Sequence, residues 1–152
     1  MAWRWRWAVP QAWAWTLAAL VWVIVQGLFG KYTVTLKLYP AVVTAHLLGG
    51  LVLLALLVRQ HVAWKGAHLK APKALRRWLL ACMGVLWLQI ALGGWVSTNY
   101  AVLACTGFPQ CNSQWWPEMD FGAGFTLLRD LGMTGSGELL SLQALVAIHM
   151  AH

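Results

Sequence analysis

Three long stretches of this chain contain no charged side chain. No Asp, Glu, Lys or Arg occurs from Ala8 to Gly30, from Leu38 to Val58 or from Trp78 to Pro117. A helix needs about 20 consecutive apolar residues to cross the hydrocarbon core of a bilayer. The stretches therefore predict three membrane-spanning helices, near Ala12–Phe29, Ala41–Val58 and Trp78–Val96.

A fourth apolar stretch closes the sequence. It begins at about Glu138, and the residues Leu139–Ala151 are almost wholly apolar. At about 1.5 Å a residue, this stretch would rise about 20 Å, which is short of the roughly 30 Å hydrocarbon core. Because a carboxylate is costly inside hydrocarbon, we expect a truncated span with His152 in mid-membrane, and a chain that is a fragment of a longer protein.

The composition excludes a soluble globule. Hydrophobic residues make up 61% of the 152 residues and charged residues only 10%, whereas about a quarter of the residues are charged in soluble domains. The net charge of +7 sits in short clusters between the apolar stretches, which argues against a nucleic-acid-binding surface. The chain is therefore predicted to be an all-α integral membrane protein.

Basic residues determine the expected orientation. The segment 59–77 contains six of them, Arg59, Lys65, Lys70, Lys73, Arg76 and Arg77. Alternating Trp and Arg over residues 3–7 indicates an interfacial anchor rather than a signal peptide. Since cytoplasmic loops carry the excess of Lys and Arg, both segments are expected in the cytoplasm and the segment 97–137 outside. His61 and His68, in the basic segment, are expected to face solvent.

Two of the three cysteines lie in the long outer segment. Cys105 and Cys111 are expected in an oxidising compartment, where a disulfide bond can form between them. The alternatives are two free thiols, or a metal-binding pair that lacks its other ligands. Cys82 lies inside the third span and is expected to be a small residue of the core.

Histidines inside the membrane are the main candidates for chemistry. A neutral imidazole can bind a metal through one nitrogen while a hydrogen bond orients the other. His46 could ligate haem iron, with Gly49 and Gly50 allowing a flat macrocycle or a helix to approach, or it could hydrogen-bond across a helix interface. His149 and His152 share one helix face and could serve haem, zinc or a proton relay, although no Cys or carboxylate is near enough to complete a closed zinc site.

Two of the predicted spans share a short motif, which is a weak sign of an internal repeat. Gln26-x3-Gly30 and Gln89-x3-Gly93 each lie near the expected outer end of a span. The repeat is compatible with two related halves, although membrane helices favour these residue types in any case. The two glutamine amides are expected to hydrogen-bond between helices or to lipid headgroups.

The outer segment contains a second apolar pattern. The residues Phe121–Met133 place apolar side chains around one Arg-Asp pair, which predicts a short interfacial helix covering the outer mouth of a site. Trp95 is expected in the outer aromatic belt. Asn99 and Gln143 are expected to hydrogen-bond between helices or to reach headgroups.

Several of these motifs together resemble a known family. The stretch Gln26–Gly50, QGLFGKYTVTLKLYPAVVTAHLLGG, is similar to the central signature of the haem A synthase family, membrane enzymes that make haem A for cytochrome oxidase. Gln89–Cys105, with the FPQC of residues 108–111, resembles the start of the second half of that family. Ala147–His152 resembles its next histidine helix, and the order and spacing of the three motifs also fit.

The resemblance implies an architecture of eight membrane spans in two four-helix bundles. On that architecture, residues 1–58 hold the last two helices of the first bundle, residues 59–77 form a basic cytoplasmic loop, and residues 78–152 begin the second bundle. The outer cysteine pair matches that of the family, which implies the same disulfide. Together with the basic loop, the resemblance places the chain in the cell inner (plasma) membrane, with several spans and a cytoplasmic N-terminus.

The resemblance also implies roles for the three histidines. His46 matches the second histidine of the first pair, which is associated with the haem O substrate, so it is the catalytic candidate. His152 matches the first histidine of the second pair, which ligates a haem b cofactor; His46 and His152 are therefore both expected to bind haem iron. His149 replaces an acidic or polar residue of the family and is expected to assist cofactor binding, by orienting His152 or by moving protons. Both partner histidines lie outside this chain, so we expect no turnover by the chain alone.

The activity implied by the resemblance is oxidation of a methyl group of haem O to a formyl group, which gives haem A for cytochrome oxidase. Alternatives are a bis-histidine membrane cytochrome that transfers electrons, and a haem-free helical membrane subunit. The expected partners are haem O and membrane lipid, with haem O synthase, an electron donor and a second copy of the chain as further candidates, and no nucleic acid.

Overall fold

The structure, a computed structural model, describes residues 10–36, 38–65 and 71–152. The expected N-terminal anchor and His68 lie outside the described residues. Over the described ranges the regular structure is helical, and β pairing is limited to two isolated bridges. The predicted all-α class is confirmed.

Three long helices form the membrane part of the chain: α2 (Pro10–Thr35), α3 (Pro40–Trp64) and α4 (Lys73–Thr98). Each is long and apolar enough to cross a bilayer, which makes the chain a multi-pass membrane protein. All three extend beyond the predicted spans because helical hydrogen bonding continues where the hydrocarbon ends. Much of the predicted basic loop is therefore helical, with Arg59 on α3 and Arg76 on α4.

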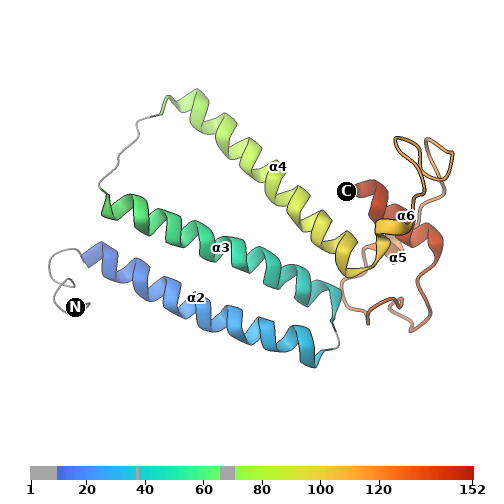
Figure 1. Cartoon of the computed structure of the whole chain (residues 1–152), viewed down its shortest axis with the longest axis horizontal. Helices are drawn as coiled ribbons and strands as arrows, with labels where there is room; N and C mark the ends of the chain where they lie inside the picture. Colours follow the sequence, from blue (N-terminus) through green and yellow to red (C-terminus); the bar gives the residue numbers. More distant parts are fainter. Residues whose placement is uncertain (1–9, 37, 66–70) are drawn as a thin grey trace.

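Prolines mark where two of these helices begin. Pro40 is the first residue of α3, and Pro72 lies directly before α4. The fixed φ of proline suits the first turn of a helix, where its missing N–H leaves no hydrogen bond unmade. Leu38, with a φ of 62°, reverses the chain so that α2 and α3 run antiparallel. Figure 1 shows these two helices side by side, with α4 meeting α3 at one end and diverging from it toward the other.

The remaining short elements gather at the end of α4. They are the 3-10 helix η1 (Ala101–Leu103), α5 (Phe121–Gly124) and α6 (Leu142–Ala151), seen together in Figure 1. The buried apolar side chains of this end include Trp95, Val96, Ala101, Ala104, Cys111, Ala144, Val146, Ala147 and Ile148. We call this the disulfide end, and the opposite end, where α3 ends and α4 begins, the basic end.

Two predicted helix boundaries are wrong. The interfacial helix expected over residues 121–133 ends at Gly124, and turns follow it, one of them at Gly132 with a φ of 73°. The fourth apolar helix begins at Leu142 rather than near Glu138, because the side chain of Ser141 caps it by accepting a hydrogen bond from the backbone N–H of Ala144 at 3.2 Å.

Two predicted side-chain environments are also wrong. Trp95 does not belong to an aromatic belt: its side chain is 5% exposed, and its indole N–H donates to the carbonyl of Gly124 at 3.0 Å. Cys82 is an exposed residue of α4 rather than a core residue. Hydropathy could place both residues on a helix, but it could not tell which face of the helix the disulfide end would cover.

Candidate functional site

His46 lies on α3 with its ring against a glycine of α2. A Cβ atom built at Gly30 would lie 3.4 Å from Cε1 and 3.7 Å from Nε2 of the imidazole. The ring therefore lies directly beside α2, at a distance where even an added Cβ would make ordinary van der Waals contact. Nδ1 of His46 is buried and has no hydrogen-bond partner among the described residues. A buried polar atom without a partner is costly, and is typical of a place where a ligand or an ordered water belongs.

About one turn deeper, α2 and α3 approach each other closely at Gly49. A Cβ atom at Gly49 would collide with the amide of Gln26, and the indole N–H of Trp22 donates to the Gly49 carbonyl at 2.8 Å. Gln26 is 9% exposed, and its Oε1 has no partner within the described ranges. Gly49 was expected to let another group pack closely against α3. In the structure that group is α2. Gly50 has nothing within 4 Å.

His152 repeats this arrangement between α6 and α4. A Cβ atom built at Gly93 would lie 3.1 Å from Cε1 and 3.6 Å from Nε2 of His152. The amide nitrogen of Gln89 lies 3.0 Å from Nδ1 of His152 and 2.9 Å from its carbonyl oxygen. Each histidine thus lies over the glycine of a Q-x3-G motif. The short repeat in the sequence therefore corresponds to the same histidine–glycine contact in two helix pairs.

The two glycines also lie at matching positions along their helices. Gly30 is five residues before the last residue of α2, Thr35 (35 − 30 = 5), and Gly93 is five residues before the last residue of α4, Thr98 (98 − 93 = 5). Five residues of helix rise about 7.5 Å. His46 and His152 therefore contact their glycines at the same distance along α2 and α4 from the ends of those helices.

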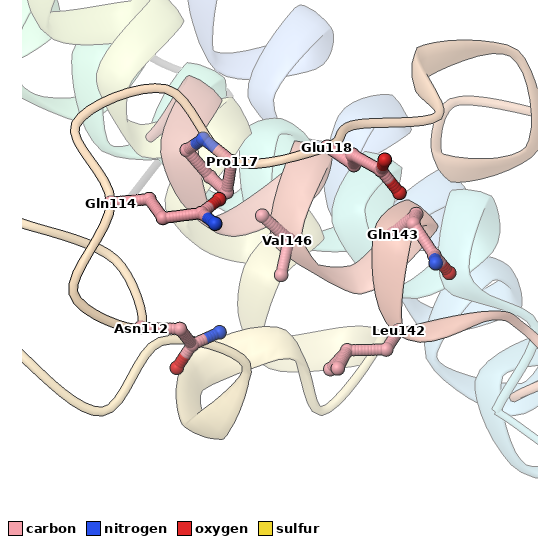
Figure 2. A pocket seen from close by; sticks show the side chains of 7 residues that line it. All are labelled: Asn112, Gln114, Pro117, Glu118, Leu142, Gln143 and Val146. Carbon is pink, nitrogen blue, oxygen red and sulfur yellow. The ribbon is translucent and has the colours of Figure 1, made fainter.

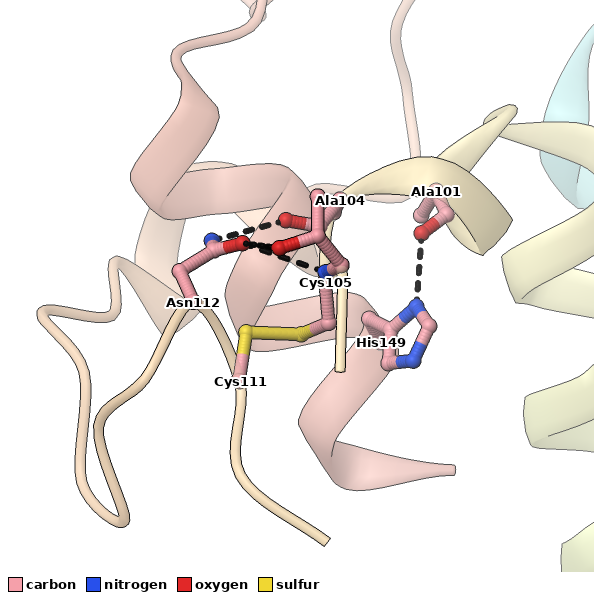
Figure 3. The surroundings of a disulfide bond; sticks show 7 residues. Ala101, Ala104, Cys105, Cys111, Asn112 and His149 are labelled. Carbon is pink, nitrogen blue, oxygen red and sulfur yellow. Dashed lines mark hydrogen bonds between the residues drawn. A yellow bond between two sulfur atoms is a disulfide. The ribbon is translucent and has the colours of Figure 1, made fainter. Parts of the chain in front are cut away.

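His149 makes its hydrogen bond to η1 rather than to His152. Its Nδ1 lies 2.9 Å from the carbonyl oxygen of Ala101 (Figure 3). Because a carbonyl only accepts, Nδ1 is the nitrogen that donates in this hydrogen bond, and Nε2 is the one left for another partner. A backbone carbonyl that fixes one imidazole nitrogen in this way is typical of histidines whose other nitrogen accepts a proton or binds a metal.

The predicted disulfide between Cys105 and Cys111 is confirmed. The Cα atoms of the two residues are 4.7 Å apart, and the bond is drawn in Figure 3. Asn112 supports the loop, since its amide donates to the carbonyl of Ala104 at 3.0 Å and accepts from the backbone N–H of Thr106 at 3.1 Å. Cys111 is buried against Val146 of α6, so the loop is anchored to the helix that carries His149 and His152.

Arg129 is a structural centre that sequence reasoning missed. Its side chain is 2% exposed and donates to three backbone carbonyls and to Oδ1 of Asn99, the last at 2.7 Å. The guanidinium also lies 5.7 Å from the ring centroid of Trp95. Burial lowers the pKa of Arg129 from its ordinary value. The only sequence signal was a single cation within an apolar, glycine-containing segment, and that segment was expected to form a short interfacial helix around one Arg-Asp pair.

A shallow pocket of about 250 Å³ lies between the disulfide loop and the start of α6 (Figure 2). Its lining residues are Asn112, Gln114, Pro117, Glu118, Leu142, Gln143 and Val146. Gln143, expected to hydrogen-bond between helices or to reach headgroups, lines this pocket. No histidine lines the pocket, so it is separate from the two imidazole positions.

The described histidines offer single ligands rather than a chelating cluster. Across residues 10–36, 38–65 and 71–152, no three His, Cys, Asp or Glu side chains converge on one point. A single imidazole suits haem iron, because the macrocycle supplies four of the ligands and the protein only the axial ones. The unpartnered Nδ1 of His46 fits such a group, because a bound ligand would give this buried atom a partner.

Comparison with known proteins identifies the family. The family model COX15-CtaA, described as "Cytochrome oxidase assembly protein", matches residues 1–152. The chain belongs to the COX15-CtaA family. It is 36% identical over 134 residues to the "Heme A synthase" of Shewanella oneidensis, a match that covers 86% of this chain and 41% of that protein.

Two further relatives extend the comparison. The "Heme A synthase" of Halalkalibacterium halodurans is 27% identical over 153 residues, covering 97% of this chain and 50% of its own length. That of Alkalihalophilus pseudofirmus is 30% identical over 122 residues, covering 76% of this chain and 41% of its own length. The chain thus spans half or less of each of these COX15-CtaA relatives. No solved structure matches it.

Proposed function

We propose that this chain is part of a haem A synthase, in which a methyl group of haem O is oxidised to the formyl group of haem A for cytochrome oxidase. Membership of the COX15-CtaA family, whose proteins typically bind haem, supports the proposal. The observation that carries it is the repeated geometry, in which two helix pairs each hold a histidine ring against a glycine five residues before the end of a long helix. We place the two rings at similar depth in the membrane. Bound haem would supply the redox chemistry of the oxidation.

His46 is the catalytic residue of this proposal, holding the iron of haem O at the α2–α3 pair. The imidazole packs beside Gly30, and the close contact at Gly49 fixes the two helices so that the ring keeps its place. Correct placement of the substrate methyl is the main contribution that such a scaffold makes.

His152 would hold the iron of haem b at the α4–α6 pair. Binding through Nε2 would require the proton on Nδ1, so the Gln89 amide, whose nitrogen lies 3.0 Å from Nδ1 and 2.9 Å from the His152 carbonyl oxygen, would have to turn in order to accept that proton. Gln89 would then fix both the ring orientation and the tautomer of His152. His149, whose Nδ1 is already bonded to Ala101, leaves Nε2 free to accept a proton beside this site.

The same proposal assigns the parts of the chain. Residues 1–58 belong to the end of one four-helix bundle and residues 78–152 to the start of a second, joined by the basic segment 59–77. The disulfide end faces the outside and the basic end the cytoplasm of a cell whose inner membrane holds the protein. Haem O synthase, an electron donor and a second copy of the chain are the proposed protein partners.

A chimera tests the function directly. The matched 134-residue segment of the Shewanella oneidensis relative is replaced by the corresponding segment of this chain, and haems are extracted from cells lacking their own enzyme. We expect haem A to form, and the substitutions His46→Ala and His152→Ala to abolish it. His61→Ala, an exposed histidine in the last turn of α3, is the matched control and should leave haem A formation unchanged.

The spectrum of the purified chimera separates the alternatives. A chimera that binds haem with a low-spin spectrum but forms no haem A would favour an electron-transfer cytochrome. A chimera that folds and shows no Soret absorbance would favour a haem-free helical subunit. Either result would contradict the proposal.

A further inference from the structure

The basic end of the molecule carries positive charge without any acidic residue nearby. Its described cations are Arg59, Lys65, Lys73, Arg76 and Arg77. The four acidic residues of the whole chain are Glu118, Asp120, Asp130 and Glu138. All four lie in the segment between α4 and α6, at the other end of the molecule. The charge of the basic end is therefore not neutralised by any carboxylate side chain of this chain.

Apolar surface adjoins this charge. α3 and α4 touch near the disulfide end, where Cδ2 of Leu47 lies 3.0 Å from the position of a Cβ at Gly94, and they diverge toward the basic end (Figure 1). On the first turns of α4, Trp78 is 72% exposed and its neighbour Leu79 is 57% exposed. Along α4, basic residues are thus followed directly by exposed apolar ones. The same order is found where a helix passes from the headgroup region into the hydrocarbon core.

A shallow depression lies at that meeting point. It measures about 350 Å³ and is lined by Ala74, Arg77, Trp78 and Ala81, which follow one face of α4. The two alanines leave space that a longer side chain would fill, while Arg77 and Trp78 border it. A guanidinium binds phosphate through paired hydrogen bonds, and an indole favours the headgroup level of a membrane.

One cation of the basic end is held in place by its neighbours. The guanidinium of Arg59 lies 4.1 Å from the ring centroid of Trp15 on α2. The next residue, Gln60, donates its amide N–H to the carbonyl of Trp15 at 2.6 Å. These contacts join the end of α3 to the start of α2, so this charge is fixed on the helix pair.

We propose that the basic end binds an anionic phospholipid, with the phosphate on Arg77 and the neighbouring cations and an acyl chain over the alanines of the α4 depression. The positive charge favours an anionic headgroup. The exposed side chains of Trp78 and Leu79 favour a lipid over a nucleic acid. The site uses no histidine, so it goes beyond the proposed haem chemistry and stands independently of it.

Native mass spectrometry of the purified chain tests the proposal. The chain is released from detergent micelles containing equal amounts of phosphatidylglycerol and phosphatidylcholine, and the bound lipid is counted. We expect phosphatidylglycerol to be retained preferentially. The double substitution Arg76→Gln and Arg77→Gln should lower that preference by about fivefold for each charge removed.

Two further variants separate a built site from general attraction. Ala81→Leu keeps every charge but fills the depression, so it should also reduce the preference for phosphatidylglycerol. Lys31→Gln removes an exposed cation of α2 near the disulfide end and should leave the preference unchanged. Equal retention of both lipids by the unmodified chain, an equal loss in Lys31→Gln, or lipid-free dimers occupying this face would each overturn the proposal.

Discussion

Gly49 and Gly50 are neighbours on α3 with opposite surroundings. We expect Gly49→Ala to destabilise the chain by about 1–3 kcal/mol, because the new Cβ meets the buried amide of Gln26. Gly50→Ala, with nothing within 4 Å, should instead stabilise it by about 0.5–1 kcal/mol through helix propensity. Unfolding of the purified variants by sodium dodecyl sulfate in mixed micelles measures both. Equal effects at the two positions would contradict the close α2–α3 contact.

Arg129 gives a second prediction at the scale of one residue. Arg129→Gln removes most of the hydrogen bonds to three carbonyls and to Asn99, and should loosen the outer segment by about 2–4 kcal/mol. Hydrogen exchange of residues 121–140 reports this loss directly. Asp130→Asn, at the exposed neighbouring position, is the control and should change the local stability by less than about 0.5 kcal/mol. Unchanged exchange in Arg129→Gln would show that the buried cation does not hold the segment together.

Residue type explains which parts of the site could be predicted. The cysteine pair was predicted correctly, and His46 and His152 were proposed as site residues, because these side chains carry rare chemistry wherever they lie. Arg129 was missed because its environment depends on a partner, Asn99, that is 30 residues away in the sequence. Nothing local to either residue indicates that contact.

The disulfide loop is the element whose contribution is most easily isolated. Closing a loop with a sequence separation of 6 is expected to stabilise the disulfide end by about 2 kcal/mol, mainly by restricting the unfolded chain. The double variant Cys105→Ala and Cys111→Ala should therefore unfold at lower denaturant and exchange faster at the start of α6. Cys82→Ala, at an exposed position of α4, should behave as the unmodified chain. Faster exchange in Cys82→Ala alone would contradict this reading.

Hydropathy predicted the existence of the helices better than their ends. The three long helices were expected because their uncharged stretches are unmistakable. Their ends were not, because a helix stops at a capping group or a turn rather than where hydrocarbon ends, as Ser141 shows for α6. Residues 125–133 were expected to be helical from their composition, yet the carbonyls of Thr126 and Met133 accept hydrogen bonds from Arg129 instead.

For the whole molecule, the proposed orientation is directly measurable. In a Cys82→Ala background, Lys31→Cys places a thiol near the disulfide end and Lys65→Cys places one at the basic end. A membrane-impermeant maleimide applied to intact cells should label position 31 and not position 65, since the excess of basic residues stays in the cytoplasm. Labelling of position 65 alone would reverse the proposed topology.

The proposed haem sites place His46 and His152 at one depth in the bilayer, and this placement has an electrical consequence. Moving one elementary charge across a membrane potential of 100 mV involves about 2.3 kcal/mol. Two groups that lie in one plane parallel to the bilayer are at nearly the same potential, so a charge passed between them does almost no work against the field. Any exchange between the two histidine positions should therefore proceed equally well in energised and de-energised membranes.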